Sequence, residues 1–269
     1  MDTLTLACAS GEKDLVAAKL YGANTLGIIE EELPDGRWRL RAFFASGDGL
    51  ESQFAAWNPV RCTAGDTDWV RLAQAAWQPQ TVGERFYLVP SWRDDEAPPG
   101  RLRLEMPPGT ASGTGFHPCT QLALQAMERL IRPGVSFLDL GTGSGVLSAG
   151  AHLLGARPIV ACDIDEGALA AASDYLHYMQ VPARLFAGSC RSLREQSVEV
   201  AVANISARAI AAVAGPLSAC LKPGGRAFLT GFPQAEAGRL ERLLAEVALR
   251  VEETLNLAEW TGLVVAAET

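Results

Sequence analysis

The chain has 269 residues, of which 48% are apolar and 20% charged, a composition typical of a folded globular protein rather than a disordered one. No apolar stretch reaches the roughly 18 uninterrupted residues that a membrane-spanning helix needs. The first residues lack the basic start and apolar core of a signal peptide, so we expect a cytoplasmic protein. The net charge of -8 excludes a surface that grips nucleic acid non-specifically; we expect no direct sequence-specific nucleic-acid binding and no membrane association.

Cysteine and histidine are dispersed along the chain, and no pair has the spacing of a zinc site. We therefore expect free thiols, a reducing compartment and no metal. These residues are Cys8, Cys62, Cys119, Cys162, Cys190, Cys220, His117, His152 and His177.

Residues 1–64 predict a small α+β domain in which strands and helices follow the order of the ferredoxin-like split unit. The expected strands are 3–9, 25–33, 37–45 and 59–63, and the expected helices are 12–21 and 49–57. Pro34-Asp35-Gly36 is a turn signal between the two middle strands. We expect residues 65–108 to be a linker, with a helix over 66–77, a strand over 85–90 and a connecting segment over 93–108.

From residue 109 to 269, short apolar strands alternate with helices, which predicts an α/β domain with a parallel sheet covered on both faces. The expected helices are 120–131, 145–154, 166–179, 207–221 and 234–248. The expected strands are 136–140, 159–164, 183–187, 198–205, 226–230, 250–260 and 263–267. We expect the last two strands to form a hairpin that turns at Thr261-Gly262 and closes the sheet.

A glycine-rich turn is the strongest functional signal, and it lies at the junction of a predicted strand and a predicted helix. Gly141, Gly143 and Gly145 let the backbone turn sharply and leave room for a ligand against the main chain. Asp163 ends the next predicted strand, where its carboxylate can accept hydrogen bonds from both hydroxyls of a ribose. The alternative is a tight turn with an acidic helix cap, but the turn and the acid together favour nucleoside binding.

Two departures from the dinucleotide-binding pattern indicate which nucleoside is bound. The third glycine of Gly-x-Gly-x-x-Gly would fall at position 146, where this chain has Val146. Asp139 precedes the turn by two residues, and its carboxylate suits a cationic sulfonium ligand better than a pyrophosphate. The chain therefore resembles the class I S-adenosylmethionine-dependent methyltransferases, whose sheet is parallel except for a reversed last strand.

Two further signals lie near the predicted site. Asn204 ends the fourth strand of the domain, where its amide oxygen can accept a hydrogen bond from a substrate amine; capping of the next helix is the alternative. Residues 112–120 contain closely spaced glycines that could fold over a ligand as a lid. Within this segment, His117 is either a general base or a loop-stabilising residue, and Thr120 is either a site residue or an N-cap.

Several motifs together make the chain similar to the PrmA family, the bacterial methyltransferases that modify ribosomal protein L11. They are Gly-Thr-Gly-x-His-x-x-Thr before a helix, Asp-Leu-Gly-Thr-Gly-Ser-Gly, Asp-Ile-Asp, Asn-Ile, Leu-x-Pro-Gly-Gly before a strand, Asp68-Trp69, Pro90-Ser91-Trp92 and Glu259-Trp260. The resemblance covers nearly the whole chain. It implies a seven-stranded, Rossmann-like catalytic domain after a ferredoxin-like domain that recognises the substrate.

The resemblance also implies the cofactor, the partner and the site. The methyl donor would be S-adenosylmethionine, with S-adenosylhomocysteine as product, and the acceptors would be lysine or N-terminal amines of L11, free or on the large ribosomal subunit. Asn204 would orient the amine for in-line attack as the catalytic residue. The implied cofactor contacts are Gly113, Thr114, Gly115, Thr120, Gly141, Gly143, Asp163 and Asn204.

Three departures from the family keep other functions open. Ser112, Cys119 and Ser206 stand where the family usually has Phe, usually Thr and often Leu, which could reshape the acceptor pocket. A related methyltransferase for other protein lysines or for a small molecule is therefore one alternative. A nicotinamide-dependent oxidoreductase and a non-catalytic ribosome-associated protein are the others; the glycine spacing argues against the former and the intact site residues against the latter.

Overall fold

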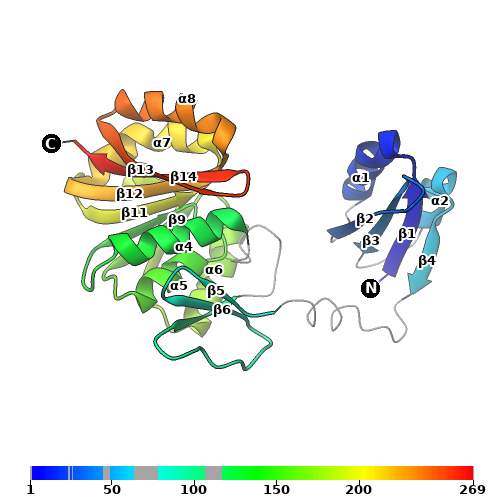
Figure 1. Ribbon diagram of the computed structural model, residues 1–269, viewed down its shortest axis with the longest axis horizontal. Helices are drawn as coiled ribbons and strands as arrows, with labels where there is room; N and C mark the ends of the chain where they lie inside the picture. Colours follow the sequence, from blue (N-terminus) through cyan, green and yellow to red (C-terminus); the bar gives the residue numbers. More distant parts are fainter. Residues whose placement is uncertain are drawn as a thin grey trace. The chain divides into compact units, whose positions relative to one another are not determined.

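The computed structural model describes residues 2–23, 25, 27–44, 49–63, 78–106 and 117–268. Contacts between residues divide the chain into two units, Met1–Ala76 and Trp77–Thr269, and each is described by itself (Figure 1). The helix expected over 66–77 lies outside the described residues. None of the described helices is both long enough and apolar enough to cross a membrane.

The first unit is a four-stranded antiparallel sheet with strands in the order β2-β3-β1-β4. Its elements are β1 (Asp2–Cys8), η1 (Ser10–Glu12), α1 (Lys13–Gly22), β2 (Gly27–Glu32), β3 (Trp38–Phe44), α2 (Leu50–Gln53), η2 (Ala55–Trp57) and β4 (Val60–Thr63). This order confirms the ferredoxin-like arrangement. The prediction of a single helix over 49–57 is wrong. Phe54, which lies between α2 and η2 in the chain, leaves the helical conformation and buries its ring in the core.

The second unit contains a seven-stranded sheet in the order β10-β9-β8-β11-β12-β14-β13. Only β14 runs antiparallel to its two neighbours, β12 and β13. The strands are β8 (Phe137–Leu140), β9 (Ile159–Asp163), β10 (Ala183–Ala187), β11 (Val198–Asn204), β12 (Leu221–Pro233), β13 (Leu249–Leu257) and β14 (Trp260–Ala267). A parallel sheet with one reversed strand at this place confirms the fold class that the sequence predicts.

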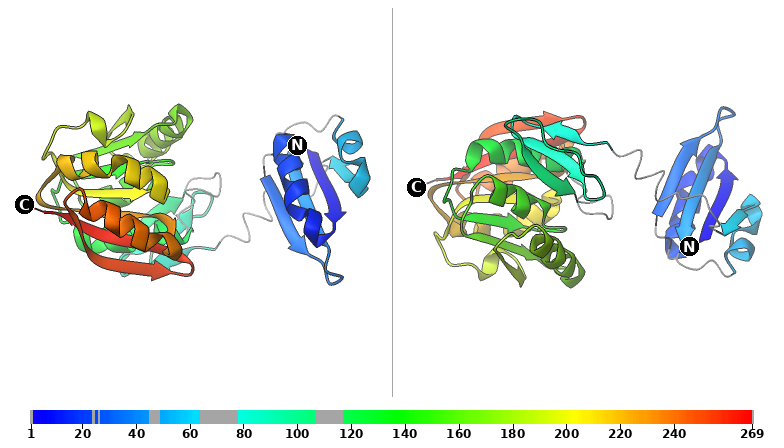
Figure 2. Two further views of the ribbon diagram at one scale, coloured as in Figure 1. Left: turned by 90° about the horizontal axis from the view of Figure 1, so that it is seen from above. Right: turned by 90° about the horizontal axis from the view of Figure 1, so that it is seen from below.

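Helices cover both faces of this sheet (Figure 2). One face packs against α4, α5 and α6, the other against α7 and α8, and each side has its own apolar core. The helices are α4 (Pro118–Leu130), α5 (Val146–Leu153), α6 (Glu166–Tyr178), η3 (Cys190–Ser192), α7 (Ala207–Cys220) and α8 (Gln234–Ala245). Because both faces are buried, the central strands are almost continuously apolar, as the sequence suggested.

The closing hairpin forms as expected, but it turns at a different place. The turn lies at Ala258 and Glu259, between β13 and β14, with Ala258 in the left-handed conformation (φ 53°). The turn expected at Thr261-Gly262 is wrong because both residues lie inside β14. A Cβ atom on Gly262 would stand only 2.1 Å from Cζ of Phe228. The glycine therefore leaves room for the packed ring of Phe228 and does not form a turn.

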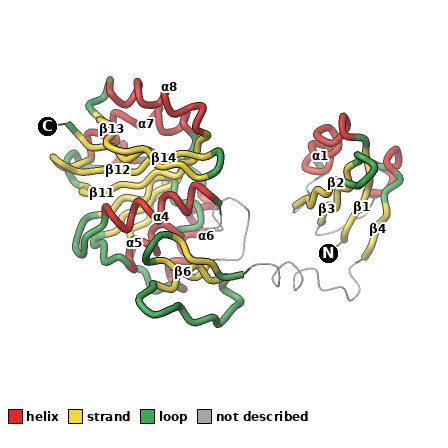
Figure 3. The backbone as a smooth tube through the Cα atoms, in the orientation of Figure 1, coloured by secondary structure: helices red, strands yellow, loops and turns green. Residues whose placement is uncertain are grey.

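The expected linker contains a small three-stranded sheet of β5 (Gln80–Val82), β6 (Phe86–Pro90) and β7 (Leu102–Met106) (Figure 3). Its apolar side chains, among them Phe86, belong to the same core as α4 and α5. The described part of the linker, 78–106, is therefore part of the second unit rather than a free connection. Because 93–108 is rich in Asp, Pro, Gly and Arg, the sequence predicts a connecting segment there and no strand β7.

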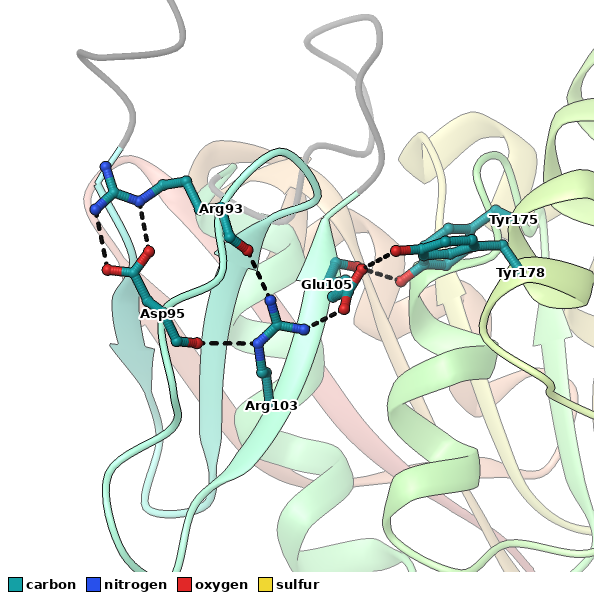
Figure 4. Close-up of polar contacts among 6 residues, drawn as sticks. All are labelled: Arg93, Asp95, Arg103, Glu105, Tyr175 and Tyr178. Atoms are coloured by element: carbon teal, nitrogen blue, oxygen red, sulfur yellow. Dashed lines mark hydrogen bonds and ion pairs between the residues drawn. The ribbon is translucent and has the colours of Figure 1, made fainter.

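A polar network joins this small sheet to α6 (Figure 4). Its members are Arg93, Asp95, Arg103, Glu105, Tyr175 and Tyr178. Arg103 donates to the main-chain oxygens of Arg93 (2.8 Å) and Asp95 (3.0 Å) and pairs with the carboxylate of Glu105. From α6, the hydroxyl of Tyr175 donates to the main-chain oxygen of Glu105, and that of Tyr178 donates to its carboxylate at 2.6 Å. The network fixes α6 against β7.

Candidate functional site

An open pocket of about 300 Å³ lies at the carboxyl ends of β8 and β11. Its walls come from segments far apart in the sequence: the start of α4, the glycine turn after β8, the loop after β11, the end of β12 and the start of β14. Four predicted site residues line it, namely Thr120, Gly141, Gly143 and Asn204. The predicted lid residues Gly113, Thr114 and Gly115, and the departure at Ser112, lie outside the described residues, and their roles stay predictions.

The glycine turn brings main chain, without side chains, to the pocket. Gly141, Gly143 and Gly145 all have positive φ angles, of 76°, 54° and 83°. A Cβ atom on Gly141 would stand 2.3 Å from Cγ2 of Ile205, so only glycine allows the turn to pass this close to the loop after β11. At Gly143 a Cβ atom would meet nothing within 4 Å, so the backbone there is open to a ligand.

Asp163 connects this turn to the start of α6 through its two carboxylate oxygens. One oxygen accepts a hydrogen bond from the main-chain N–H of Gly143 at 3.0 Å, and the other from that of Asp165 at 3.1 Å. The helix cap of α6 is Asp165, which accepts from the N–H of Gly167, so the alternative of Asp163 as an acidic cap is wrong. The next residue, Ile164, is 86% exposed, an apolar side chain at a predicted nucleoside site that the sequence analysis did not single out.

Asp139 lies fully buried beneath the turn. One of its carboxylate oxygens accepts three hydrogen bonds, from the hydroxyls of Thr142 (2.9 Å) and Ser148 (2.7 Å) and the N–H of Ser148 (3.0 Å). The other oxygen is buried and has no partner among the residues that the structure describes. Burial raises the pKa of this carboxyl, because the charged form loses its hydration.

Thr120 and Asn204 meet at the centre of the site. The side-chain nitrogen of Asn204 donates to the hydroxyl of Thr120 at 3.3 Å. Neither residue is the helix cap that the alternative interpretations suggested, because His117 caps α4 and Ser206 caps α7. Thr120 lies in the first turn of α4 with only 1% of its surface exposed, and Asn204 ends β11. Both are therefore held at the pocket by packing and by each other.

His117 and Trp260 form one wall of the pocket. The Nδ1 atom of His117 accepts the main-chain N–H of Cys119 at 3.3 Å, which favours the loop-stabilising interpretation. Its ring lies edge-on to Trp260, with 4.7 Å between centroids and 68° between planes. The sequence marks Trp260 only as part of the Glu259-Trp260 motif, which predicts no role for it in the site. Cys119 is buried, and burial raises the pKa of its thiol, so it is an inert packing residue rather than a nucleophile.

Comparisons with known proteins agree with this geometry. A family model described as ribosomal protein L11 methyltransferase (PrmA) matches residues 47–268. Proteins named ribosomal protein L11 methyltransferase from Cupriavidus necator and Burkholderia orbicola are 40% and 37% identical to the chain over 196 residues. These matches cover 72% of this chain, which spans only 62% of the length of either relative.

A solved structure shows the same fold. The crystal structure described as ribosomal protein L11 methylase from Lactobacillus delbrueckii subsp. bulgaricus resembles the chain with a TM-score of 0.66 at 24% identity. The match covers 72% of the present chain and 99% of the chain in that crystal structure. The match of the family model over residues 47–268 shows that the chain belongs to the PrmA family.

Proposed function

We propose that the chain is an S-adenosylmethionine-dependent protein methyltransferase that acts on amines of ribosomal protein L11. One observation carries the proposal: Thr120 and Asn204 line one pocket together with the glycine turn, and Asp163 is hydrogen-bonded to that turn. The family assignment and the names of the relatives support L11 as the substrate. The first unit, with its ferredoxin-like sheet, would contribute recognition of that protein.

The residues present fit S-adenosylmethionine. The open backbone at Gly143 leaves space beside Asp163, whose carboxylate can accept ribose hydroxyls. The exposed side chain of Ile164 supplies an apolar surface next to that carboxylate for an adenine ring. The buried carboxyl of Asp139 lies beneath the turn, and a cationic ligand nearby would favour its charged form. When bound, S-adenosylmethionine supplies a methyl group on a positively charged sulfur.

Asn204 would orient the acceptor amine. Its amide nitrogen is committed to Thr120, so its carbonyl oxygen is left to accept a hydrogen bond from a substrate N–H. A lysine amine in water has a pKa of about 10.4 and must lose a proton to water before it can attack. The apolar surfaces of Ile205 and Trp260 would lower that pKa by desolvation. His117 uses Nδ1 to cap α4, so positioning rather than general-base catalysis carries the reaction.

Mass spectrometry tests the proposal. L11 incubated with the chain and S-adenosylmethionine should gain mass in steps of one methyl group. Asn204→Ala should abolish the gain while calorimetry still detects cofactor binding, and Asp163→Ala should weaken that binding. Asn256→Ala, on the exposed side of β13, is the matched control and should leave both unchanged.

The other outcomes separate the alternatives. Cofactor binding without any mass gain would contradict L11 as the substrate and favour another acceptor. Failure to bind S-adenosylmethionine would contradict the methyltransferase, and a nicotinamide titration would then test the oxidoreductase.

A further inference from the structure

The hairpin tip between β13 and β14 has the features of a receptor for a cationic amine. We propose that the Glu259 carboxylate binds the protonated acceptor amine at the mouth of the pocket and that the ring of Trp260 packs against it. The inference deepens the proposed function and rests on it, because it names the element that selects the acceptor.

The strand order places this tip on the acceptor side of the site. Along the carboxyl edge of the sheet, the glycine turn follows β8, Asn204 ends β11, Gly231 lies near the end of β12, and Trp260 begins β14. Neighbouring strands lie about 4.8 Å apart, so Asn204 stands between the glycine turn and Trp260. With the cofactor at the glycine turn, an acceptor that reaches Asn204 from the other side passes Trp260 and the tip.

The tip is held in place by main-chain contacts that leave the carboxylate of Glu259 unused. The main-chain N–H of Gln234, the first residue of α8, donates to the oxygen of Glu259 at 3.0 Å. The side-chain nitrogen of Gln234 donates to the oxygen of Ala258 at 2.8 Å. The ring of Trp260 also packs edge-on against the ring of His117. The tip is thus a built feature rather than a loose loop.

Glu259 differs from the other carboxylates of the same hairpin. Glu252 is paired with Arg226 at 2.7 Å and with Arg250, and Glu253 is paired with Arg129. The exposed side chain of Glu259 has neither a hydrogen-bond nor an ion-pair partner within the described part of the chain.

The negative charge of Glu259 affects a residue in the first turn of α4. Burial raises the pKa of the Cys119 thiol, and the charge of Glu259 raises it further; Cys119 directly precedes Thr120. The exposed Glu259 directly precedes Trp260, whose side chain lines the pocket, so the hairpin tip carries a carboxylate and an aromatic ring on neighbouring residues. This is the pairing that recognises ammonium groups, by charge and by cation–π attraction.

The same contacts serve more than one methyl transfer. A mono- or dimethylated amine is again protonated in water, so the carboxylate and the ring would bind it as they bind the first substrate. In each round the ammonium gives its proton to water before the neutral amine attacks, and Glu259 stays ionised. A neutral side chain of the same length would form neither the ion pair with Glu259 nor the cation–π contact with Trp260.

Nuclear magnetic resonance on the full chain, saturated with S-adenosylhomocysteine, tests the inference. The indole N–H signal of Trp260 is assigned among the six tryptophans with Trp260→Phe. Capped lysine and capped trimethyl-lysine are titrated in turn, with capped norleucine as the neutral probe. Both cations should shift the signal, and Glu259→Gln should weaken their binding about tenfold, which corresponds to about 1.4 kcal/mol. Glu195→Gln, an exposed carboxylate before β11, is the matched control and should bind as the parent does.

Equal binding by Glu259→Gln and the parent, equal binding of norleucine, or no shift with either cation would each overturn the inference. A methylation assay on L11 separates this failure from that of the proposed function. If L11 is methylated and Glu259→Gln has the parent KM for it, the tip is not the receptor although the function holds. If L11 is not methylated but the cations bind through Glu259, the receptor stands and the acceptor is another amine.

Discussion

The side-chain nitrogen of Asn204 lies 3.3 Å from the hydroxyl of Thr120, although 84 positions separate the two residues in the sequence. The hydrogen bond joins the end of β11 to the first turn of α4 across the pocket. Since an amide can present either its oxygen or its nitrogen, the bond also decides which atom faces a substrate. A threonine outside the reaction thereby sets the orientation of the residue proposed to hold the amine.

Replacing this hydroxyl should lower turnover more than it lowers stability. Thr120→Val keeps the shape but removes the acceptor, at a cost of about 1 kcal/mol or about fivefold in rate. We expect kcat for methylation to fall while the Kd of S-adenosylhomocysteine changes little. Thr120→Ser restores the hydroxyl and should recover kcat; equal kcat for the Val and Ser variants would contradict the orienting role.

Two glycines with the same backbone conformation should respond differently to alanine. Gly141 and Gly224 have φ angles of 76° and 73°, but only at Gly141 would a Cβ atom collide, at 2.3 Å, with Ile205. Gly224→Ala should cost about 1–2 kcal/mol for the left-handed backbone. Gly141→Ala should cost a further 1–3 kcal/mol or so for overpacking and abolish cofactor binding. Denaturant unfolding and calorimetry measure both, and similar losses in the two variants would refute the steric argument.

Acid should weaken the second unit through Glu199. Hydrogen bonds from the main-chain N–H and hydroxyl of Ser136, at 2.9 and 2.8 Å, lower the pKa of this carboxyl, with help from Lys222. A lowered folded-state pKa means that the contribution is complete above the unfolded value of about 4.3 and is lost as pH falls through the folded value.

Glu199→Gln should remove that part of the pH dependence. Because the side chain is 41% exposed, solvent screening limits the loss at pH 7 to about 0.5–1 kcal/mol. Urea unfolding of the parent and the variant between pH 3 and 7 should give curves that converge at the acid end. Parallel curves across that range would exclude Glu199 as the source.

The two tyrosines of the network in Figure 4 should contribute unequally. Tyr175→Phe leaves a main-chain oxygen of Glu105 without its buried donor and should cost about 1–3 kcal/mol. Tyr178 is 60% exposed, so Tyr178→Phe should change stability by less than about 0.5 kcal/mol. Thermal unfolding ranks the two, and the reverse ranking would be inconsistent with burial as the cause.

The effect of Tyr175 should extend to the cofactor. The next residue, Leu176, packs beneath the glycine turn, where a Cβ atom on Gly145 would stand 3.1 Å from its Cγ. A shift of α6 therefore moves the support of the turn. We expect Tyr175→Phe to weaken binding of S-adenosylhomocysteine and Tyr178→Phe to leave it unchanged in the same calorimetric assay.

Hydrophobic periodicity and turn residues predict most of the helices and strands correctly. They fail at positions where tertiary packing determines the local structure. The alternation of strands and helices, the ferredoxin-like order and the closing hairpin all follow from periodicity and turn residues. The sequence predicts a turn at Gly262, because a sequence cannot show that the ring of Phe228 fills the space beside it. The segment 93–108 was read as a connection, because its turn-forming residues conceal the alternating Leu102, Leu104 and Met106 of β7.

The candidate residues of the nucleoside site follow from local sequence, because a glycine turn and an acid one strand later obey a fixed geometry in parallel α/β sheets. The choice between the alternatives for Thr120, Asn204 and His117 depends on the folded structure, since capping and pocket roles share the same local sequence. The folded structure alone placed Trp260 in the wall of the pocket and Glu259 at the tip of the hairpin that precedes it. Strand order within a sheet depends on which apolar faces pack together, and that information is spread over the whole chain.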